Sequence, residues 1–363
     1  MCHKDLFTTS CFLFLNFVLI ACMSAPSRMN KNEASHVSES SILNANELKI
    51  DELEIENYFQ NNRKHFVYVS DTNPIPGSIE TVYFLPKTKD ASAAIKDTSF
   101  KLSVYDKHDK LIAKTNFFEW NVEEEKNIFA AVFSLPSTVA AGRSTIKIVG
   151  DKRFKKNLRI NIAQKEFTAE HIPLDPANTS LRTTPDPQKT KEAQILWQIL
   201  ETTGSEVYSE GPFTPPVARN TRRTSFFGDR RVYDYSDGTS ATSIHAGIDY
   251  GVPRGTQVAA CARGKVVLAR PRIVTGNSVI LEHLPGLYTI YYHLDKITAK
   301  ENSIVEEGEL IGLSGSTGLS TGPHLHWEIR SSTENTDPDI VSSRKILDKD
   351  AVLSGLTANQ KKH

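Results

Sequence analysis

The chain has 363 residues, and its 43 Lys and Arg balance its 43 Asp and Glu, so the formal net charge is zero. This balance argues against nucleic acid as a partner, and the 24% charged and 39% hydrophobic fractions are typical of soluble globular domains. The length is sufficient for two domains with connecting segments. The chain has only four cysteines, so we expect no disulfide framework.

Residues 1–21 have the features of a secretory signal peptide. Lys4 precedes an apolar stretch from Cys11 to Ala21 that is too short to span a bilayer. The stretch ends in Leu19-Ile20-Ala21-Cys22, which resembles the lipobox of bacterial lipoproteins, where the signal is cut before a lipidated Cys. We therefore expect lipidation at Cys22. Cleavage near Ser24, or an uncleaved anchor, are the alternatives.

The next two segments differ in composition. Residues 22–64 are rich in Ser, Asn, Glu and Lys, which predicts a flexible tether. Residues 65–165 contain seven short apolar or alternating runs, most of them separated by turn signals, and these predict a β-sandwich with immunoglobulin-like topology as one option. The runs are Phe66–Val69, Thr81–Leu85, Phe100–Tyr105, Leu111–Trp120, Ile128–Leu135, Thr145–Val149 and Leu158–Ile162.

Residues 166–220 are rich in Pro and Thr and are predicted to be a linker with one helix. Within Thr190–Glu201, Ala193, Leu196, Trp197 and Leu200 share one face at helical spacing. Because this linker immediately precedes the next domain, one hypothesis is that its carboxylates or amides lie across a groove of that domain.

Residues 221–335 combine predicted strands with tight turns, and residues 336–363 are expected to be a C-terminal tail with a surface helix near Arg344–Leu353. Pro285-Gly286 is a hairpin-turn signal between two of the strands. The predicted strands are Gln257–Ala262, Lys265–Ala269, Ser278–Glu282, Tyr288–His293 and His324–Ile329. The expected fold class is therefore mainly β throughout.

Four residues of this region predict a metal site: His245, Asp249, His324 and His326. On an extended segment, residues two or four apart face the same way, so each pair presents its side chains on one side. Three protein ligands with a fourth position open are typical of a catalytic zinc site. The helical zinc motif with two His flanking a Glu is missing, so a histidine is the expected general base, with His324 or His293 as candidates.

The residues around these positions resemble the lysostaphin-type zinc endopeptidases of bacterial cell walls, the LytM-domain group. The matching phrases are His245-Ala-Gly-Ile-Asp249, Gly286–Leu294 and Gly312–Glu328, and Phe227–Arg230 resembles the opening of that domain. The resemblance covers roughly residues 221–332 and does not reach the first 165.

This resemblance implies that His245, Asp249 and His326 bind one Zn²⁺, and that His324 is the general base for the attacking water. His293 would stabilise the tetrahedral intermediate or assist proton transfer. It also implies an antiparallel β-sheet domain with a central groove. The substrate would be peptide cross-links or stem peptides of peptidoglycan.

Several other conspicuous residues have simpler explanations. Cys261 lies in an apolar run and is expected to be buried in the core. Trp327 is expected in the core, His283 in a structural or supporting role, and Glu328 paired with Arg330 or holding a neighbouring strand. Arg230 and Arg231 have two explanations: they are solvated surface charges, or they contact an anionic stem peptide. One of Tyr291 and Tyr292 should pack and the other should line the groove.

The leading hypothesis is thus a lipid-anchored zinc endopeptidase in the bacterial cell envelope, facing the periplasm, with the outer membrane favoured. A plain secreted or periplasmic protein is the alternative. One competing function is a non-enzymatic LytM-like protein that binds peptidoglycan or activates another hydrolase, and another is an adhesion or scaffold role for the sandwich. Expected partners are peptidoglycan, the membrane through the lipid, and an unidentified regulatory envelope protein.

Overall fold

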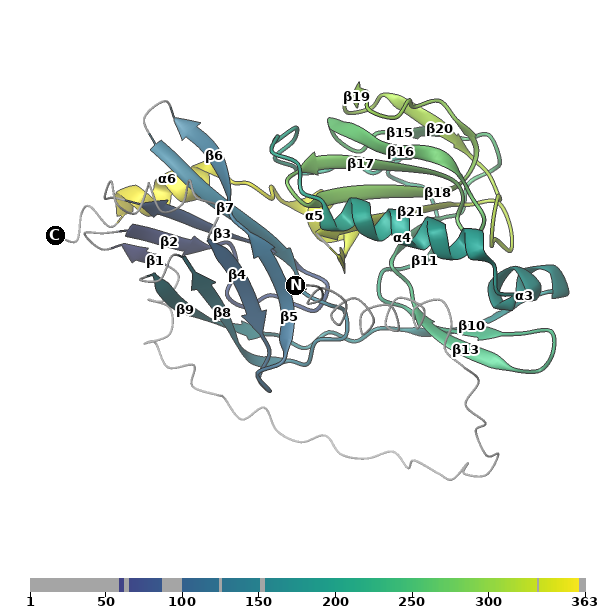
Figure 1. Cartoon of the computed structure of the whole chain (residues 1–363), viewed down its shortest axis with the longest axis horizontal. Helices are drawn as coiled ribbons and strands as arrows, with labels where there is room; N and C mark the ends of the chain where they lie inside the picture. The colour runs from purple at the N-terminus through teal and green to yellow at the C-terminus, as the bar shows by residue number, and fades with distance from the viewer. Residues whose placement is uncertain are drawn as a thin grey trace, which may run out of the picture.

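The computed structural model describes residues 59–61, 65–86, 100–123, 126–150, 154–331 and 333–358. The predicted signal peptide, Cys22 and most of the predicted tether lie outside these residues. Within them the protein is mainly β, as expected, and its sheets form a sandwich beside a ten-stranded sheet (Figure 1). No helix of the described part is long and apolar enough to cross a membrane.

The sandwich consists of sheets with the orders β1–β2–β3–β7–β6 and β5–β4–β8–β9. Alternate residues such as Phe84, Val104 and Ile148 face inward and form one buried core between the sheets. The strands are β1 (Phe59–Asn61), β2 (His65–Val69), β3 (Ile79–Pro86), β4 (Lys101–Tyr105), β5 (Leu111–Asn116), β6 (Phe118–Glu123), β7 (Lys126–Ser134), β8 (Gly142–Val149) and β9 (Lys155–Ile162).

Two strand predictions differ from the structure in this region. The run Leu111–Trp120 is two strands, because the chain passes from one sheet to the other at Phe117, so that β5 and β6 belong to opposite sheets. A further short strand, β1, lies within the segment predicted to be a tether and pairs with β2.

The predicted surface helix at Arg344–Leu353 is confirmed only from Lys349 onward, and Arg344 to Asp348 are not helical. Two helices, α5 (Pro338–Ser343) and α6 (Lys349–Ala358), flank a non-helical stretch whose Ile346 and Leu347 are buried. The outer face of the sandwich carries large apolar side chains such as Phe66 and Tyr83, and a sheet buries such a face against another layer. Residues 338–352 supply that layer and join the sandwich and the ten-stranded sheet in one continuous core.

An ion pair between a half-buried arginine and a buried carboxylate fixes this C-terminal segment to the sandwich. Arg344 Nη2 lies 2.7 Å from Glu80 Oε1, and the Glu80 side chain is fully buried in β3. Glu80 also accepts a hydrogen bond of 2.6 Å from Ser70 Oγ. Burial raises the pKa of Glu80 to about 7 even though Arg344 lowers it.

We expect Arg344→Ala to lower the free energy of unfolding by about 1–3 kcal/mol, because it removes the counter-ion of Glu80 and the hydrogen bonds to Glu80 and to the backbone oxygen of Ile79, while protonation of Glu80 limits the cost. Lys345→Ala is the matched control, since Lys345 makes only an exposed pair with Asp350, whose loss costs about 0–1 kcal/mol. A carboxyl with a higher pKa in the folded chain binds its proton more tightly when folded. At pH 6 Glu80 is mostly protonated and needs no counter-ion, whereas at pH 8 it is mostly ionised in the wild type. The loss of unfolding free energy in Arg344→Ala should therefore be greater at pH 8 than at pH 6. Urea unfolding at both pH values measures this, and equal deficits for the two variants would contradict it.

The ten-stranded sheet is antiparallel, with the order β11–β14–β21–β18–β17–β16–β19 and with β15, β20 and β22 paired at its margins. Pro285-Gly286 forms the predicted two-residue turn, because Leu284 and Leu287 pair across it. The strands are β11 (Arg223–Ser225), β14 (Gly247–Tyr250), β15 (Gln257–Ala259), β16 (Gly264–Arg272), β17 (Gly276–Leu284), β18 (Leu287–Ile297), β19 (Ile304–Val305), β20 (Leu310–Ser314), β21 (Leu325–Ser331) and β22 (Glu334–Thr336).

The predicted linker contains two helices and a strand instead of one helix. The helices are α3 (Pro176–Thr183) and α4 (Pro187–Glu201), and strand β10 (Ala169–Pro173) forms a small sheet with β12 (Arg230–Asp234) and β13 (Ser240–Ile244). Asp186 caps α4 by accepting from Gln188 N at 2.6 Å.

Helix α4 covers part of one face of the ten-stranded sheet (Figure 1). Its apolar residues, including Leu196 and Leu200, pack on Ile280 of β17 and on Tyr288 and Ile290 of β18. The packed stripe also includes Ile195 and Ile199, so it is rotated from the predicted one, and Trp197 lines a groove instead.

Candidate functional site

Three of the predicted residues converge on one point. His326 Nδ1 lies 2.6 Å from Asp249 Oδ1, His245 Nε2 lies 3.1 Å from the same oxygen, and the two histidine nitrogens are 3.0 Å apart. These three side chains form a group that could hold a metal ion. All three are buried.

Strand pairing accounts for this convergence. Asp249 in β14 is directly opposite His326 in β21, so their side chains leave the sheet on the same face. His245 precedes β14 by two residues. Gly247 begins β14, and a Cβ atom there would lie 2.1 Å from the carbonyl oxygen of Trp327. Only glycine therefore allows β14 to approach β21 closely enough for this pairing.

Hydrogen bonds determine which nitrogen of each histidine is free. Nδ1 of His245, His293 and His324 lies 2.7, 2.8 and 2.8 Å from the backbone oxygens of Phe226, Thr317 and Gly322 respectively. A carbonyl oxygen only accepts, so each Nδ1 carries the proton and each Nε2 keeps its lone pair. His326 is reversed: its Nε2 lies 3.0 Å from Glu328 Oε1, and its Nδ1 faces Asp249.

The donor set of these residues fits a divalent cation. With the proton of His326 on Nε2, two nitrogen lone pairs and a carboxylate oxygen face one another with no proton between them, and these are the donors of zinc sites. Burial alone would raise the pKa of Asp249, but His326 and His245 hold it well below its ordinary value. Burial lowers the pKa of His326, but Asp249 and Glu328 raise it to about 9. Without a cation, a proton on His326 therefore balances the carboxylates.

His293 reaches the site through an irregularity in β18. Alternate residues of this strand face opposite sides, so Tyr291 packs in the core and Tyr292 lines the groove, where it stacks on the ring of His326 at 5.5 Å. Regular alternation would turn His293 away from the groove. A register shift opposite Asn277 and Val279, with a left-handed φ of 60° at His293, places its ring 4.7 Å from that of His324.

His293 and His324 are neutral imidazoles beside the three-residue cluster. Burial, together with His324 and His326, lowers the pKa of His293 to about 3. Burial also lowers the pKa of His324, whose Nε2 lies 4.0 Å from Asp249 Oδ1. Each ring therefore keeps an unprotonated Nε2 at neutral pH.

A second ring of polar residues supports His326. Glu328 accepts from His326 Nε2, and its other oxygen lies 2.9 Å from Arg330 Nε and 3.2 Å from Asn335 Nδ2. The predicted Glu328–Arg330 pair is thus confirmed, while the contact of Glu328 with His326 was not predicted.

His283 is structural as expected, since it is buried and bonds to Arg263 O and Thr289. Cys261 and Trp327 are buried in the core, also as expected.

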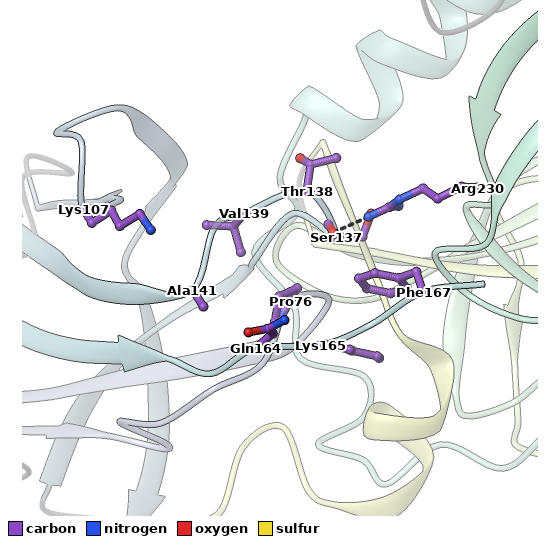
Figure 2. Close-up of a pocket in the computed structure, with 10 residues that line it drawn as sticks. All are labelled: Pro76, Lys107, Ser137, Thr138, Val139, Ala141, Gln164, Lys165, Phe167 and Arg230. Carbon is purple, nitrogen blue, oxygen red and sulfur yellow. Dashed lines mark hydrogen bonds between the residues drawn. The ribbon is translucent and has the colours of Figure 1, made fainter. Parts of the chain in front are cut away.

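Arg231 is a site residue that the sequence analysis did not identify. Its Nη2 lies 2.6 Å from Asp249 Oδ2, and its side chain is only 12% exposed, so it is not surface charge. Its neighbour Arg230 points elsewhere and bonds to Ser137 of the sandwich (Figure 2). Arg230 lines a pocket of about 390 Å³ that contains none of the five predicted site residues. No local motif distinguishes the two arginines in the sequence.

The site opens into a groove of about 2950 Å³. Its walls include β5 of the sandwich, α4 of the linker, the β12–β13 hairpin and the loop of residues 319–324. Among the described residues, the metal-binding group contains no linker carboxylate. The linker instead reaches the site indirectly, through Glu170 on Arg231 and through Asn178 on the carbonyl of Ser320 at 3.4 Å.

Comparison with known proteins identifies the domain that carries this site. Residues 243–338 match peptidase family M23. This stretch is an M23-type domain within a longer chain. Enzymes of this family are metallopeptidases, and the M23 domain of this chain contains all five predicted site residues. Glu170 and Arg231 lie before the matched stretch.

Two curated relatives are named as peptidases, and the name of one of them includes peptidoglycan. The peptidoglycan DD-endopeptidase ShyA of Vibrio cholerae is 40% identical over 114 residues, which are 31% of this chain and 26% of that protein. The DD-carboxypeptidase/endopeptidase Mpg of Neisseria meningitidis is 37% identical over 135 residues, 37% of this chain and 30% of that protein. The matches thus span less than a third of each relative.

One solved structure extends the likeness beyond the M23 domain. A Pseudomonas aeruginosa chain assigned to peptidase M23 aligns with 74% of this chain and 94% of its own length. The TM-score is 0.50 at 21% sequence identity, so the likeness concerns the fold alone.

Proposed function

We propose that this protein is a zinc-dependent endopeptidase of the bacterial cell wall, which hydrolyses peptide bonds in the stem peptides or cross-links of peptidoglycan. The observation that carries the proposal is the convergence of three buried ligand atoms beside two neutral imidazoles. The name of the V. cholerae relative, a peptidoglycan DD-endopeptidase, supports peptidoglycan as the substrate, and the name of the N. meningitidis relative supports endopeptidase or carboxypeptidase action.

In this proposal, the zinc ligands are His245 Nε2, Asp249 Oδ1 and His326 Nδ1. A bound Zn²⁺ would supply Lewis acidity, which lowers the pKa of a water and polarises a peptide carbonyl. Glu328 holds the proton of His326 on Nε2 and so keeps Nδ1 free, an arrangement common around metal-binding histidines.

His324 is proposed as the general base. Its Nε2 carries a lone pair, faces the cluster 4.0 Å from Asp249 Oδ1, and can take a proton from the attacking water. The same nitrogen can later give that proton to the leaving amine.

His293 is proposed to support the negative oxygen that develops on the scissile carbonyl, or to assist the proton transfer. Its Nδ1–H is committed to Thr317 O, so Nε2 is the atom that meets the reacting groups. Nε2 accepts a proton in the neutral ring, and it can donate to the negative oxygen only after it has taken up that proton.

The groove favours an extended peptide substrate. Its walls come from several elements and leave the cluster accessible along their length, in contrast to a closed cavity for a small molecule. The alternative of a non-enzymatic LytM-like protein is typical of chains that lack metal or catalytic positions. This chain has all five, and they meet in one site.

The proposed location is the cell envelope, with the protein anchored by lipid on Cys22 and facing the periplasm, on the outer membrane. The sequence Leu19-Ile20-Ala21-Cys22 supports this proposal. Incorporation of labelled palmitate, compared between the wild type and Cys22→Ala, tests it, and equal labelling of the two would refute it.

Digestion of purified sacculi by the whole chain tests the enzymatic proposal. We expect soluble muropeptides in the presence of zinc, none after chelation, and recovery when zinc is restored. Mass analysis of the fragments identifies the bond that is cut and separates endopeptidase from carboxypeptidase products. A zinc-loaded chain that releases no fragments, but that binds sacculi, would favour the non-enzymatic alternative.

A further inference from the structure

Both oxygens of the Asp249 carboxylate have defined partners. Oδ1 faces the nitrogens of His245 and His326, whereas Oδ2 accepts a hydrogen bond of 2.6 Å from Arg231 Nη2. The side chains of Asp249 and Arg231 are 9% and 12% exposed. A charge-assisted hydrogen bond that is shielded from water is among the strongest polar contacts in proteins, so it is able to determine how the carboxylate is turned.

Two further residues lock the guanidinium in this position. Arg231 Nε donates to Glu170 Oε1 at 2.6 Å, and Arg231 Nη2 donates to Ser225 Oγ at 2.6 Å. Ser225 Oγ in turn donates to Glu170 Oε1 at 2.7 Å.

Strand pairing places every member of this network. Glu170 of β10 is the pairing partner of Arg231 in β12, and Ser225 of β11 is the pairing partner of Asp249 in β14. The guanidinium therefore bridges two sheets and has little freedom to move away from Asp249.

The charges of the network suit a cation nearby. A lone arginine next to a zinc ligand would repel the metal, but the carboxylate of Glu170 balances the charge of Arg231. The Arg231–Glu170 pair can thus orient Asp249 while adding no net charge to the site.

We infer that Arg231, anchored by Glu170, is a positioning residue that reserves Oδ1 of Asp249 for the metal, so that Asp249 binds through one oxygen. A single-oxygen ligand leaves coordination positions for water and substrate. The inference rests on the proposed role of Asp249 as a ligand. It also means that strand β10, which lies well before the stretch matched to the family, completes the metal site.

Zinc affinity of the whole chain tests this inference, with zinc alone as the probe and a coloured chelator of known affinity as competitor. We expect Arg231→Ala to weaken zinc binding by roughly 10- to 100-fold, the usual effect of removing a partner of a metal ligand. Arg231→Lys retains the charge but loses the fork that reaches both carboxylates, so it should recover part of this loss. Glu170→Gln should also weaken binding, because it leaves the charge of Arg231 unbalanced. Arg254→Ala is the matched control, since it removes an exposed Arg–Asp pair elsewhere in the M23 domain.

Melting temperatures in excess chelator separate positioning from folding. Weaker zinc binding at an unchanged melting temperature supports the inference, whereas Arg231→Ala with the zinc affinity of the wild type overturns it. If Arg231→Ala is unfolded in chelator, the zinc affinities and melting temperatures of Arg231→Lys and Glu170→Gln are compared with the wild type in the same way. A wild type that binds zinc but cuts no sacculi would refute the proposed function and leave this inference standing.

Discussion

Replacing His326 by Ala is expected to abolish zinc binding and peptidoglycan hydrolysis together. His326 Nδ1 is central to the cluster, 2.6 Å from Asp249 Oδ1 and 3.0 Å from His245 Nε2. Its loss leaves two ligands for a metal that needs at least three from the protein in a catalytic site. We expect zinc affinity to fall by more than about 100-fold, the upper range for residues that merely support a ligand. Hydrolysis should fall to the level of the chelated wild type.

His171→Ala is the matched control for this experiment. His171 is an exposed histidine in β10 that lies 3.0 Å from Asp234 and is outside the metal-binding group, so its removal should change neither zinc content nor activity. Elemental analysis and sacculus digestion measure the two quantities on the same samples. A His326→Ala protein that still carries one zinc per chain would show that His326 is not a ligand.

The candidate residues of the metal cluster could be predicted from two short motifs, His245-x-x-x-Asp249 and His324-x-His326, and the resemblance then implied which of them are ligands. Residues that are two apart on a strand point to the same face of the sheet, so the spacing of His324 and His326 already predicted that their side chains lie on one side. The structure adds the register that the spacing does not contain, namely that Asp249 is opposite His326. The phrase around His293 placed this residue near the site by resemblance, but the alternation of β18 alone would have turned it away. A register shift in β18 turns His293 toward the site, and no residue pattern in the strand predicts this shift.

The contributions from distant segments could not be predicted. Glu170 and Arg231 are 61 positions apart and meet through a parallel strand pair, which no periodicity within either segment encodes. The same holds for Arg344 and Glu80, which are 264 positions apart. In both cases the sequence alone suggests a charged side chain exposed to solvent, and only long-range packing shows that Arg231 and Glu80 are buried. The local strands were therefore largely predictable, while the polar contacts between segments were not.

His324→Ala is expected to retain zinc but to lower kcat by roughly 10²- to 10⁴-fold, the usual contribution of a general base. His324 Nε2 lies 4.0 Å from Asp249 Oδ1 and is outside the metal-binding group, so removing the ring leaves all three ligands in place. Comparison with His326→Ala is especially informative, because the two histidines are two residues apart on the same segment. One substitution should remove catalysis alone, and the other should remove catalysis and metal.

The pH dependence of the residual rate provides an independent check on this role. Burial lowers the pKa of His324 below its ordinary value of 6.5, so the neutral, proton-accepting form persists when the pH falls to that value. Wild-type kcat should therefore decline only in more acidic solution, and this decline should be absent or displaced in His324→Ala. His324→Ala with normal kcat, or with the zinc loss of His326→Ala, would contradict the assignment. In the first case the base would have to be sought at His293, the other neutral imidazole beside the cluster.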